Sequence, residues 1–319
     1  MSGIGLGLAA LGRPGYVNLG HAADLKGNYA VAAMEAQTHA VLDAAWEAGV
    51  RYYDVARSYG RAEPFLASWL AARGIPPAEV VIGSKWGYIY TADWRPDAPV
   101  HEIKDHTLPN LQRQWQESQE WLTSYLRLYQ IHSATFESGV LDNIAVLTEL
   151  MRQKEGGIVV GLSLSGPNQP AVLERAAAIE VDGVRLFDVV QATWNLLEPS
   201  VGPMLQSART RGMGVLVQEA LANGRLTTRN TDPACAAKRQ VLEQQAARLA
   251  TTLDALALAA VLAQPWVDVV LSGATTVDQL QSNLRALGVS WDAEAASALA
   301  QLVEEPTRYW QIRRSLPWN

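Results

Sequence analysis

The sequence is poor in cysteine, in clustered positive charge and in long apolar runs. Cys235 is the one cysteine among 319 residues, so no disulfide can form within the chain. A reducing compartment suits such a chain, and we expect a cytoplasmic location. The net charge is −6 and the basic residues form no block, which argues against a nucleic-acid partner.

No segment has the pattern of a membrane anchor. The first twelve residues, MSGIGLGLAALG, contain no basic residue and no long apolar run, unlike a secretory signal. The most apolar later stretch, residues 253–266, is too short to cross a bilayer. We therefore expect no membrane partner, whereas the sequence leaves the oligomeric state open.

Histidine is also scarce, with five residues in the chain. His21, His39, His101 and His106 have no metal-ligand spacing, so we expect no metal site. His101 and His106 lie five residues apart in a predicted loop, and we expect both at the surface.

Eight short β-rich runs alternate with segments of helical periodicity. The runs are residues 3–11, 51–56, 80–86, 126–133, 158–164, 187–194, 214–221 and 267–274. Such alternation predicts repeated βαβ units and a parallel sheet. Eight strands and this length favour a closed (β/α)8 TIM barrel, and a doubly wound open sheet is the alternative. No linker divides the chain, so we expect one α/β domain over residues 1–319.

Three of the intervening segments show a clear apolar face followed by glycine, a helix-ending residue. In residues 61–73 the face consists of Phe65, Leu66, Trp69 and Leu70, and Gly74 follows. In residues 140–151 it consists of Leu141, Ile144, Leu147, Leu150 and Met151, and Gly156 follows. In residues 277–287 it consists of Leu280, Leu284 and Leu287, and Gly288 follows.

The first run contains Gly5, Gly7 and Ala10 at the spacing of a dinucleotide-binding fingerprint. That fingerprint requires a strand before its first glycine, and only four residues precede Gly5. We therefore interpret the run as a glycine-rich strand that something approaches closely.

Polar residues stand at the carboxyl ends of seven successive strands. They are Asp54, Ser84 and Lys85, His132 and Ser133, Ser163, Gln191, Gln218 and Glu219, and Ser272. In a β/α barrel these ends meet at the face that carries the active site. Any one of these residues has a structural explanation on its own, such as a cap or an ion pair, but the ordered set points to a functional site.

Three of these residues, Asp54, Lys85 and His132, together with Tyr59 suggest proton transfer to a carbonyl oxygen. Lys85 near Asp54 would be held by an ion pair, and its ammonium group would lower the pKa of Tyr59. Tyr59 would then act as a general acid, and a neutral His132 would orient the carbonyl oxygen. The chain has no nucleophile elbow for acyl transfer. Hydride must come from elsewhere.

The sequence contains three irregular segments, and the two internal ones are predicted to emerge on this face as walls of a substrate pocket. Residues 87–108 follow the third strand, residues 222–238 follow the seventh, and residues 305–319 form a C-terminal tail. Loops of this length in a compact domain are usually functional. Tryptophans in loops or at strand ends are further candidates for an apolar pocket lining: Trp86, Trp94, Trp194, Trp310 and Trp318.

These stretches resemble the aldo-keto reductase family along nearly the whole chain. The resemblance rests on YYDVARSYG, GSKWG, YQIHS, VVQATWNLLEP and LSGATTVDQLQSN. It implies a barrel that binds an extended nicotinamide cofactor across its carboxyl face and reversibly reduces an aldehyde, ketone or sugar lactol to an alcohol.

The resemblance also implies roles for individual residues. The catalytic residues would be Asp54, Tyr59, Lys85 and His132, with Trp86 and His132 contacting the substrate. The cofactor would contact Ser163, Gln191, Gln218, Glu219, Leu221, Gly224, Ser272, Gly273, Ala274, Thr275, Gln279 and Asn283.

The chain departs from the family pattern at three places. Leu164 replaces an asparagine that contacts the nicotinamide carboxamide, and Gln218 stands where an aromatic residue usually stacks. The segment 272–283 contains no cation for the 2′-phosphate of NADP. The amino terminus of the helix that starts near Val277 can still bind a phosphate, and Arg225 or Arg229 can supply positive charge. Family habit favours NADP(H), with NAD(H) a close second.

Two other functions are compatible with parts of this pattern. The altered nicotinamide contacts suggest a regulatory subunit that binds the cofactor with negligible turnover. A Schiff-base lyase using Lys85 is disfavoured, because the neighbouring Asp54 would keep the amine protonated and poorly nucleophilic.

Overall fold

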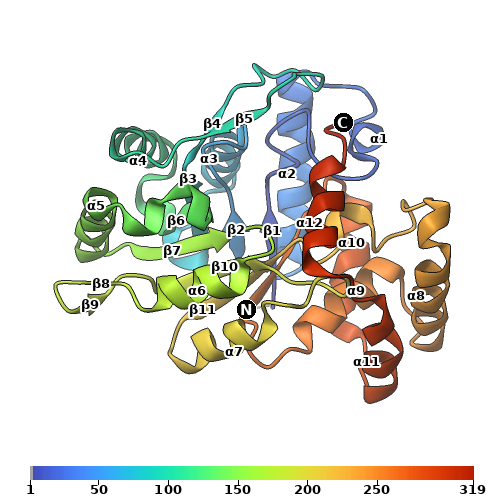
Figure 1. The fold of residues 1–319 in the computed structure, drawn as a ribbon. Coiled ribbons are helices and arrows are strands. Elements are labelled where there is room, and N and C mark those ends of the chain that lie inside the picture. The colour runs from blue at the N-terminus through green and yellow to red at the C-terminus, as the bar shows by residue number, and fades with distance from the viewer. Residues whose placement is uncertain (1–2) are drawn as a thin grey trace.

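Eight parallel strands close into a barrel in the computed structural model, which describes residues 3–319 (Figure 1). In spatial order the strands are β1 (Ile4–Gly7), β12 (Val269–Ser272), β11 (Gly214–Gln218), β10 (Val189–Thr193), β7 (Val159–Leu164), β6 (Leu126–Ala134), β3 (Val81–Trp86) and β2 (Tyr52–Asp54). All eight predicted runs form these strands. Closure comes from β1, which pairs with β12 through Ile4 and Val270 and with β2 through Leu6 and Tyr53. The open-sheet alternative is therefore wrong.

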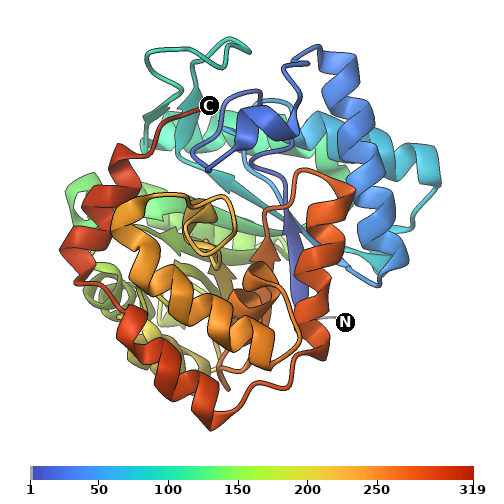
Figure 2. The ribbon, with the colours of Figure 1, turned by 90° about the vertical axis from the view of Figure 1, so that its right-hand side faces the viewer.

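Helices cover the outside of the barrel (Figures 1 and 2). They are α1 (His21–Asp24), α2 (Val31–Glu47), α3 (Ala62–Arg73), α4 (Leu108–Leu122), α5 (Ile144–Glu155), α6 (Gln169–Ala177), α7 (Gly202–Thr210), α8 (Ala236–Arg248), α9 (Leu253–Leu262), α10 (Val277–Leu284), α11 (Ala293–Leu299) and α12 (Pro306–Ser315). Short 3-10 turns occupy Pro77–Glu79, Thr123–Tyr125, Phe136–Ser138, Val140–Asp142, Ala222–Gly224, Pro233–Cys235, Arg285–Gly288 and Ala300–Leu302.

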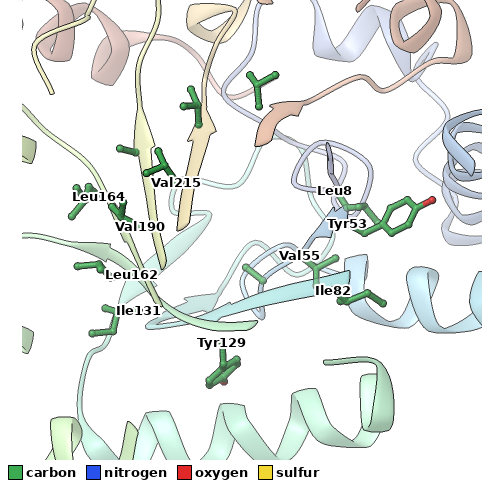
Figure 3. Close-up of a cluster of buried hydrophobic side chains, with 14 of the residues drawn as sticks. Leu8, Tyr53, Val55, Ile82, Tyr129, Ile131, Leu162, Leu164, Val190 and Val215 are labelled. Atoms are coloured by element: carbon green, nitrogen blue, oxygen red, sulfur yellow. The ribbon is translucent and has the colours of Figure 1, made fainter. Parts of the chain in front are cut away.

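The main core lies between the strands and the surrounding helices. Figure 3 shows side chains of this layer, among them Tyr53, Ile82, Leu162, Val190 and Val215. A second apolar cluster joins α8, α9, α11 and α12, the orange and red elements of Figure 2. The C-terminal elements are thus packed onto the barrel rather than extending from it.

A plug of apolar side chains fills the interior of the barrel below the polar strand ends. It consists of Tyr52, Leu128, Leu216 and Leu271. The Tyr52 ring occupies the space left by two glycines, because a Cβ on Gly83 would lie 2.5 Å from its hydroxyl and one on Gly5 2.8 Å from its ring. The sequence predicts that another group lies close to the glycine-rich first strand. At Gly5, that group is the Tyr52 ring.

The predicted helical segments are confirmed with two exceptions in their apolar faces. Helix α3 buries Phe65, Leu66 and Trp69 and ends at Gly74, whose φ of 61° is left-handed. Ile144 is 78% exposed and Leu287 is 49% exposed. Ile144 opens helix α5 just after its cap, Asn143, and Leu287 lies in the 3-10 turn that ends α10, so neither shares the buried face of its helix.

Two segments expected to be irregular are partly ordered. Residues 87–108 contain an antiparallel hairpin of β4 (Tyr88–Tyr90) and β5 (Glu102–Lys104). Most of the tail forms helix α12, which Glu305 caps through the backbone amides of Thr307 and Arg308. A second small hairpin pairs β8 (Glu180–Val181) with β9 (Val184–Arg185).

Within residues 3–319, no individual helix has both the length and the apolarity needed to cross a membrane. One bent pair, Pro233–Arg248 with Leu253–Leu262, passes that test by length and composition only, with an 81° bend between its halves.

The backbone around Gly12 packs directly on the turn that carries Tyr59. The Gly12 carbonyl accepts a 2.7 Å hydrogen bond from the Arg61 amide, and a Cβ on Gly60 would lie 2.5 Å from the Gly12 oxygen. Gly60 also has a φ of 59°. Two glycines therefore hold the β1–α1 segment against the β2–α3 turn.

We predict that Gly12→Ala destabilises the protein by about 1–3 kcal/mol, because the new methyl group overlaps fixed backbone rather than a side chain that can move. Its Cβ would overlap the Tyr59 carbonyl oxygen and lie 2.7 Å from the Ala62 nitrogen. The free energy of unfolding from urea denaturation tests this. Gly288→Ala is the control, since no atom lies within 4 Å of its added Cβ. Equal stability of Gly12→Ala and wild type would contradict the packing argument.

Candidate active site

The carboxyl ends of the strands open into a cavity of about 850 Å³. It extends from the neighbourhood of Tyr59 and His132, at one end, to the amino-terminal turns of α9 and α10, at the other. Small residues of β1 and the turn after it, Gly7, Ala9 and Ala10, line its floor. The cavity therefore lies over the strand ends at which the sequence places its polar residues.

An ion pair between Asp54 and Lys85 forms the base of the site. Both side chains are buried, and the ammonium group also donates to the Val55 carbonyl oxygen at 3.1 Å. Burial raises the pKa of Asp54, and the adjacent Lys85 ammonium opposes that rise. The ion pair expected from neighbouring strand ends is confirmed.

Tyr59 reaches this pair from the turn after β2. Its hydroxyl lies 3.5 Å from Lys85 Nζ and 3.4 Å from His132 Nε2. Burial raises the Tyr59 pKa well above 10, and the Asp54 carboxylate raises it further. The lowering of the Tyr59 pKa expected from Lys85 is thus outweighed, because the Tyr59 hydroxyl is buried and the Lys85 charge is paired with Asp54. Tyr59 is a protonated phenol at neutral pH.

His132 is held neutral beside the tyrosine. Burial lowers its pKa well below 6.5, and the nearby Lys85 and Arg13 charges act in the same direction. Its Nδ1 lies 3.5 Å from the Ser58 hydroxyl, and its ring meets the Tyr59 ring edge-on at 5.4 Å. A neutral imidazole and a phenol therefore share one corner of the cavity.

His106 is buried beside the His132 backbone, contrary to the expectation that it lies at the surface. Its Nε2 lies 2.9 Å from the His132 carbonyl oxygen, and burial lowers its pKa to about 4. His101 is also buried and stacks on Trp318 with 4.2 Å between ring centroids. The loop lies close enough to the barrel to bury both rings, and His106 packs against Gly87.

Arg57 does not face the cavity. It donates to Glu63 at 2.5 Å and to Glu117 at 2.9 Å. The buried Glu63 carboxylate also accepts hydrogen bonds from Ser84 and Ser118. This network joins the Tyr59 turn to α3, β3 and α4, so Arg57 holds the turn in place.

Most residues predicted to contact a cofactor line the cavity. They are Gln191, Gln218, Glu219, Leu221, Gly224, Ser272, Gly273, Ala274, Gln279 and Asn283. Asn283 donates to the Ser272 hydroxyl at 2.8 Å, and a Cβ on Gly273 would meet no atom within 4 Å. The open backbone at Gly273 leaves room for a group to lie against it.

Three predicted contact residues do not line the cavity. The Ser163 hydroxyl turns toward the Ser133 amide, and Thr275 bonds to Asp24 below the surface of the cavity. Trp86 is fully buried in the core, with its ring edge against His106. Its strand position directs it outward, since it follows Lys85, which points into the barrel.

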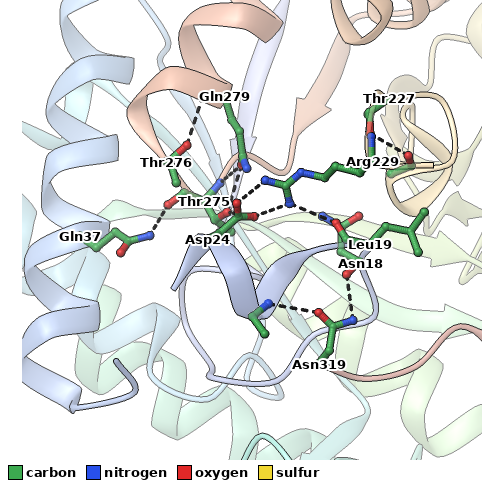
Figure 4. A network of polar contacts seen from close by, with 12 residues as sticks. Asn18, Leu19, Asp24, Gln37, Thr227, Arg229, Thr275, Thr276, Gln279 and Asn319 are labelled. Atoms are coloured by element: carbon green, nitrogen blue, oxygen red, sulfur yellow. Dashed lines mark hydrogen bonds and ion pairs between the residues drawn. The ribbon is translucent and has the colours of Figure 1, made fainter. Parts of the chain in front are cut away.

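A polar network closes over the far end of the cavity (Figure 4). Asp24 on α1 pairs with both terminal nitrogens of Arg229, from the loop after β11, and accepts from Thr275 at 2.9 Å. Burial acts to raise the pKa of Asp24, but hydrogen bonds from Arg229, Gln279 and Thr275 bring it below its usual value. Among the described residues that line this end, the arginine is Arg229, and the Asp24 carboxylate already neutralises it.

Aromatic and charged side chains surround the cavity near Tyr59. Tyr16, Tyr88 and Trp318 line it, together with two ion pairs, Arg13 with Glu102 at 2.8 Å and Arg313 with Glu219 at 2.6 Å. Both loops expected to wall a pocket contribute lining residues, and so does the C-terminal tail. Of the five candidate tryptophans, Trp310 and Trp318 line the cavity.

Sequence reasoning missed the part of this rim that comes from Arg13, Tyr16 and Glu102. None of these three residues stands at the end of a barrel strand. Arg13 and Glu102, which are hydrogen-bonded, lie 89 residues apart in the sequence. The glycines flanking Arg13 were the available signal of a tight turn at that place.

A closed (β/α)8 barrel with buried Asp, Lys, Tyr and His side chains at its carboxyl face defines a class of barrel oxidoreductases. The family model described as "Aldo/keto reductase family" matches residues 4–304. The chain belongs to this family, whose members are oxidoreductases that act on carbonyl compounds with nicotinamide cofactors.

The chain is similar to several curated proteins. It is 25% identical to an NADH-specific methylglyoxal reductase of Escherichia coli over 293 residues, which cover 80% of this chain and 84% of that protein. It is 25% identical over 225 residues to a D-threo-aldose 1-dehydrogenase of Pseudomonas sp, covering 65% and 67% of the two chains. The holo form of aldo-keto reductase AKR11C1 from Bacillus halodurans shares its fold, with a TM-score of 0.69, 21% identity and coverage of 95% and 92%.

We predict that Lys85→Met lowers the free energy of unfolding by about 3–5 kcal/mol, because it leaves the Asp54 carboxylate buried without its partner. The double variant Asp54→Asn/Lys85→Met should recover most of this loss, since neither remaining group carries a charge. Urea denaturation measures both. Lys26→Met, at an exposed position, is the control and should change stability by less than about 0.5 kcal/mol. A double variant no more stable than Lys85→Met would contradict the role assigned to the ion pair.

Proposed function

We propose that the protein reversibly reduces the carbonyl group of an aldehyde, ketone or sugar lactol to an alcohol, with Tyr59 as the general acid. The observation that carries this proposal is the Tyr59 hydroxyl between Lys85 Nζ and His132 Nε2, at 3.5 and 3.4 Å, in the wall of an 850 Å³ cavity. A phenol with a raised pKa holds its proton until a stronger base, the oxyanion formed in the reaction, lies beside it.

His132 and Lys85 have separate tasks in this mechanism. Ser58 lies beside His132 Nδ1, so the other ring nitrogen faces Tyr59 and the cavity. A neutral imidazole there can hold the substrate oxygen against the tyrosine hydroxyl. Lys85 supplies positive charge that favours the phenolate once the proton has left, and Asp54 fixes the lysine.

A nicotinamide cofactor, when bound, supplies or accepts the hydride. The residues that support this assignment are Gln191 and Gln218 near the reacting end, and Ser272, Gly273, Gln279 and Asn283 toward the other end. The amino terminus of α10 opens toward the cavity and suits a phosphate group. The uncrowded backbone at Gly273 adds a cradle that a side chain would fill.

For the cofactor we propose NAD(H) in place of the NADP(H) that family habit favours. A 2′-phosphate needs a free cation, and Arg229 is committed to Asp24 while Arg225 pairs with Glu304. The other charged residues lining the far end are carboxylates: Glu243, Asp254 and Asp278. Carboxylates suit ribose hydroxyls and repel a phosphate. The Escherichia coli relative named as NADH-specific is consistent with this choice.

The cavity around Tyr59 suits a small substrate with hydroxyl groups. Two ion pairs and the Tyr16 and Tyr88 hydroxyl groups offer donors and acceptors, and the faces of Tyr88 and Trp318 offer apolar contact. The Pseudomonas relative is named for an aldose substrate, which has this chemistry. We further propose that residues 1–319 act as one domain in the cytoplasm, as the sequence predicts.

We predict that Tyr59→Phe lowers the rate of carbonyl reduction by about 100-fold or more, because it removes the proton donor and leaves the cavity unchanged in shape. The assay follows NADH or NADPH oxidation at 340 nm with a panel of aldehydes, ketones and aldoses. Tyr125→Phe is the matched control, since that hydroxyl bonds to the Ile75 carbonyl oxygen outside the cavity. Equal rates for Tyr59→Phe and wild type would refute the assignment. Tight nucleotide binding without turnover by wild type would indicate the regulatory alternative.

We predict that the Kd for NADPH exceeds the Kd for NADH by about tenfold or more, and that Asp24→Asn reduces this ratio. Removing the carboxylate releases Arg229 to pair with a 2′-phosphate. Quenching of tryptophan fluorescence measures both constants. Asp254→Asn is the control, because it removes a carboxylate of the same end and frees no arginine. Tighter binding of NADPH than NADH by wild type would overturn the preference.

A further inference from the structure

Arg13 occupies an unusual place beside the proposed general acid. Its side chain is 3% exposed, and its guanidinium carbon lies 5.1 Å from the centre of the Tyr59 ring. The same carbon lies 5.1 Å from the Tyr16 ring and 4.9 Å from the Trp318 ring. Three aromatic rings from three separate segments therefore enclose one cation at the mouth of the cavity.

The backbone fixes this cation relative to Tyr59. Gly12 and Gly60 pack against each other, and Arg13 Nη1 donates to the carbonyl oxygen of Ser58, the residue before Tyr59, at 3.1 Å. The same nitrogen donates to Glu102 at 2.8 Å. Arg13 Nε is buried and has no hydrogen-bond partner among the described residues. Ring faces, one carboxylate and one backbone carbonyl oxygen hold the guanidinium group.

We propose that Arg13 is a positioning residue that stabilises the Tyr59 phenolate, and that Glu102 moderates its charge. This inference rests on the proposed function, in which the Tyr59 O–H bond breaks and its proton joins the substrate oxygen. The electron pair stays on the phenolate, whose charge spreads into the ring that Arg13 covers. Lys85 Nζ, 5.0 Å from the centre of the same ring, supplies a second cation.

Tyr59 is surrounded by charged and titratable groups from several elements. They are Asp54 and Tyr52 on β2, Lys85 on β3, His132 on β6, Glu102 on β5, Glu219 after β11, and Arg13 and Tyr16 after β1. Burial raises the Tyr59 pKa, and the Asp54 and Glu102 carboxylates raise it further. The Arg13 guanidinium group lowers it. Removal of the Arg13 charge and removal of the Glu102 charge should therefore have opposite effects.

The test is the pH dependence of kcat/KM in the direction of alcohol oxidation, where Tyr59 must be deprotonated to accept a proton. Arg13→Gln should move the rising limb of the profile to higher pH by about one unit or more, because a cation that favours the phenolate is lost. Glu102→Gln should move it to lower pH. Arg13→Lys should restore most of the wild-type position, and Arg13→Gln/Glu102→Gln should lie between the two single variants.

Arg61→Gln provides the control, since Arg61 is an exposed arginine on the same turn whose guanidinium group lies over Trp94 instead. It should leave the profile unchanged. A raised KM in Arg13→Gln with an unmoved profile would show that Arg13 binds substrate and would overturn the proposal. A uniform loss of kcat at every pH, again with an unmoved profile, would show a role in folding alone and would also overturn it.

A second measurement separates this inference from the proposed function. Tyrosines labelled with 13C at Cζ report their protonation by NMR, and Tyr59→Phe identifies the Tyr59 signal. The signal in Arg13→Gln should remain that of the phenol to a higher pH than in wild type. If wild type reduces no carbonyl, the proposed function fails, whereas the influence of Arg13 on Tyr59 is still decided by this titration. Identical titration curves would overturn the influence of Arg13 even in an active enzyme.

Discussion

The buried ion pair between Asp54 and Lys85 is the constraint around which the rest of the site is arranged. Two charges in the barrel interior are tolerable only when each is paired and hydrogen-bonded. The barrel meets this demand by placing Asp54 at the end of β2 and Lys85 on the adjacent β3, and by directing the lysine also to the Val55 carbonyl oxygen. Below the pair, the Tyr52 ring fills the barrel and turns its hydroxyl toward Asp54 at 3.4 Å. The glycines of β1 and β3 are needed because this ring lies against their backbone.

The top of the site is held by contacts between segments that are far apart in the sequence. Asn319 exchanges backbone hydrogen bonds with Tyr16, and its side chain binds Asn18 and Ala22. The same N-terminal loop reaches the loop after β11 through Asp24 and Arg229 (Figure 4). Trp318, next to Asn319, lies beside Arg13 and Tyr16 in this arrangement. The strand ends thus supply the proposed reacting groups, whereas loops and tail supply the walls.

This division explains which features the sequence could predict. The eight strands and the residues Asp54, Lys85 and His132 follow from local patterns, because strand polarity alone brings all carboxyl ends to one face. Tyr59 follows from its spacing in the sequence, since it comes five residues after Asp54. The positions of Arg13, Glu102 and Trp318 depend on how loops pack on one another, which no local pattern encodes. The error on His101 and His106 has the same origin, since their loop is drawn onto the barrel by contacts with Trp318 and with the His132 carbonyl oxygen. Trp86 was misplaced because strand alternation sends it outward next to an inward Lys85.

The charged groups around Tyr59 are balanced in pairs. Three ion pairs, Asp54–Lys85, Arg13–Glu102 and Arg313–Glu219, border a phenol and an imidazole that are both neutral. Because each pair sums to no net charge, the resting site tolerates burial and the phenol keeps its proton. In the proposed reaction, the Tyr59 proton moves to the substrate oxygen and leaves a phenolate. The cations of two pairs, Lys85 and Arg13, lie within about 5 Å of the Tyr59 ring, so positive groups are already fixed where this negative charge would form. Under this proposal the orientation of the ion pairs, rather than their number, stabilises the phenolate.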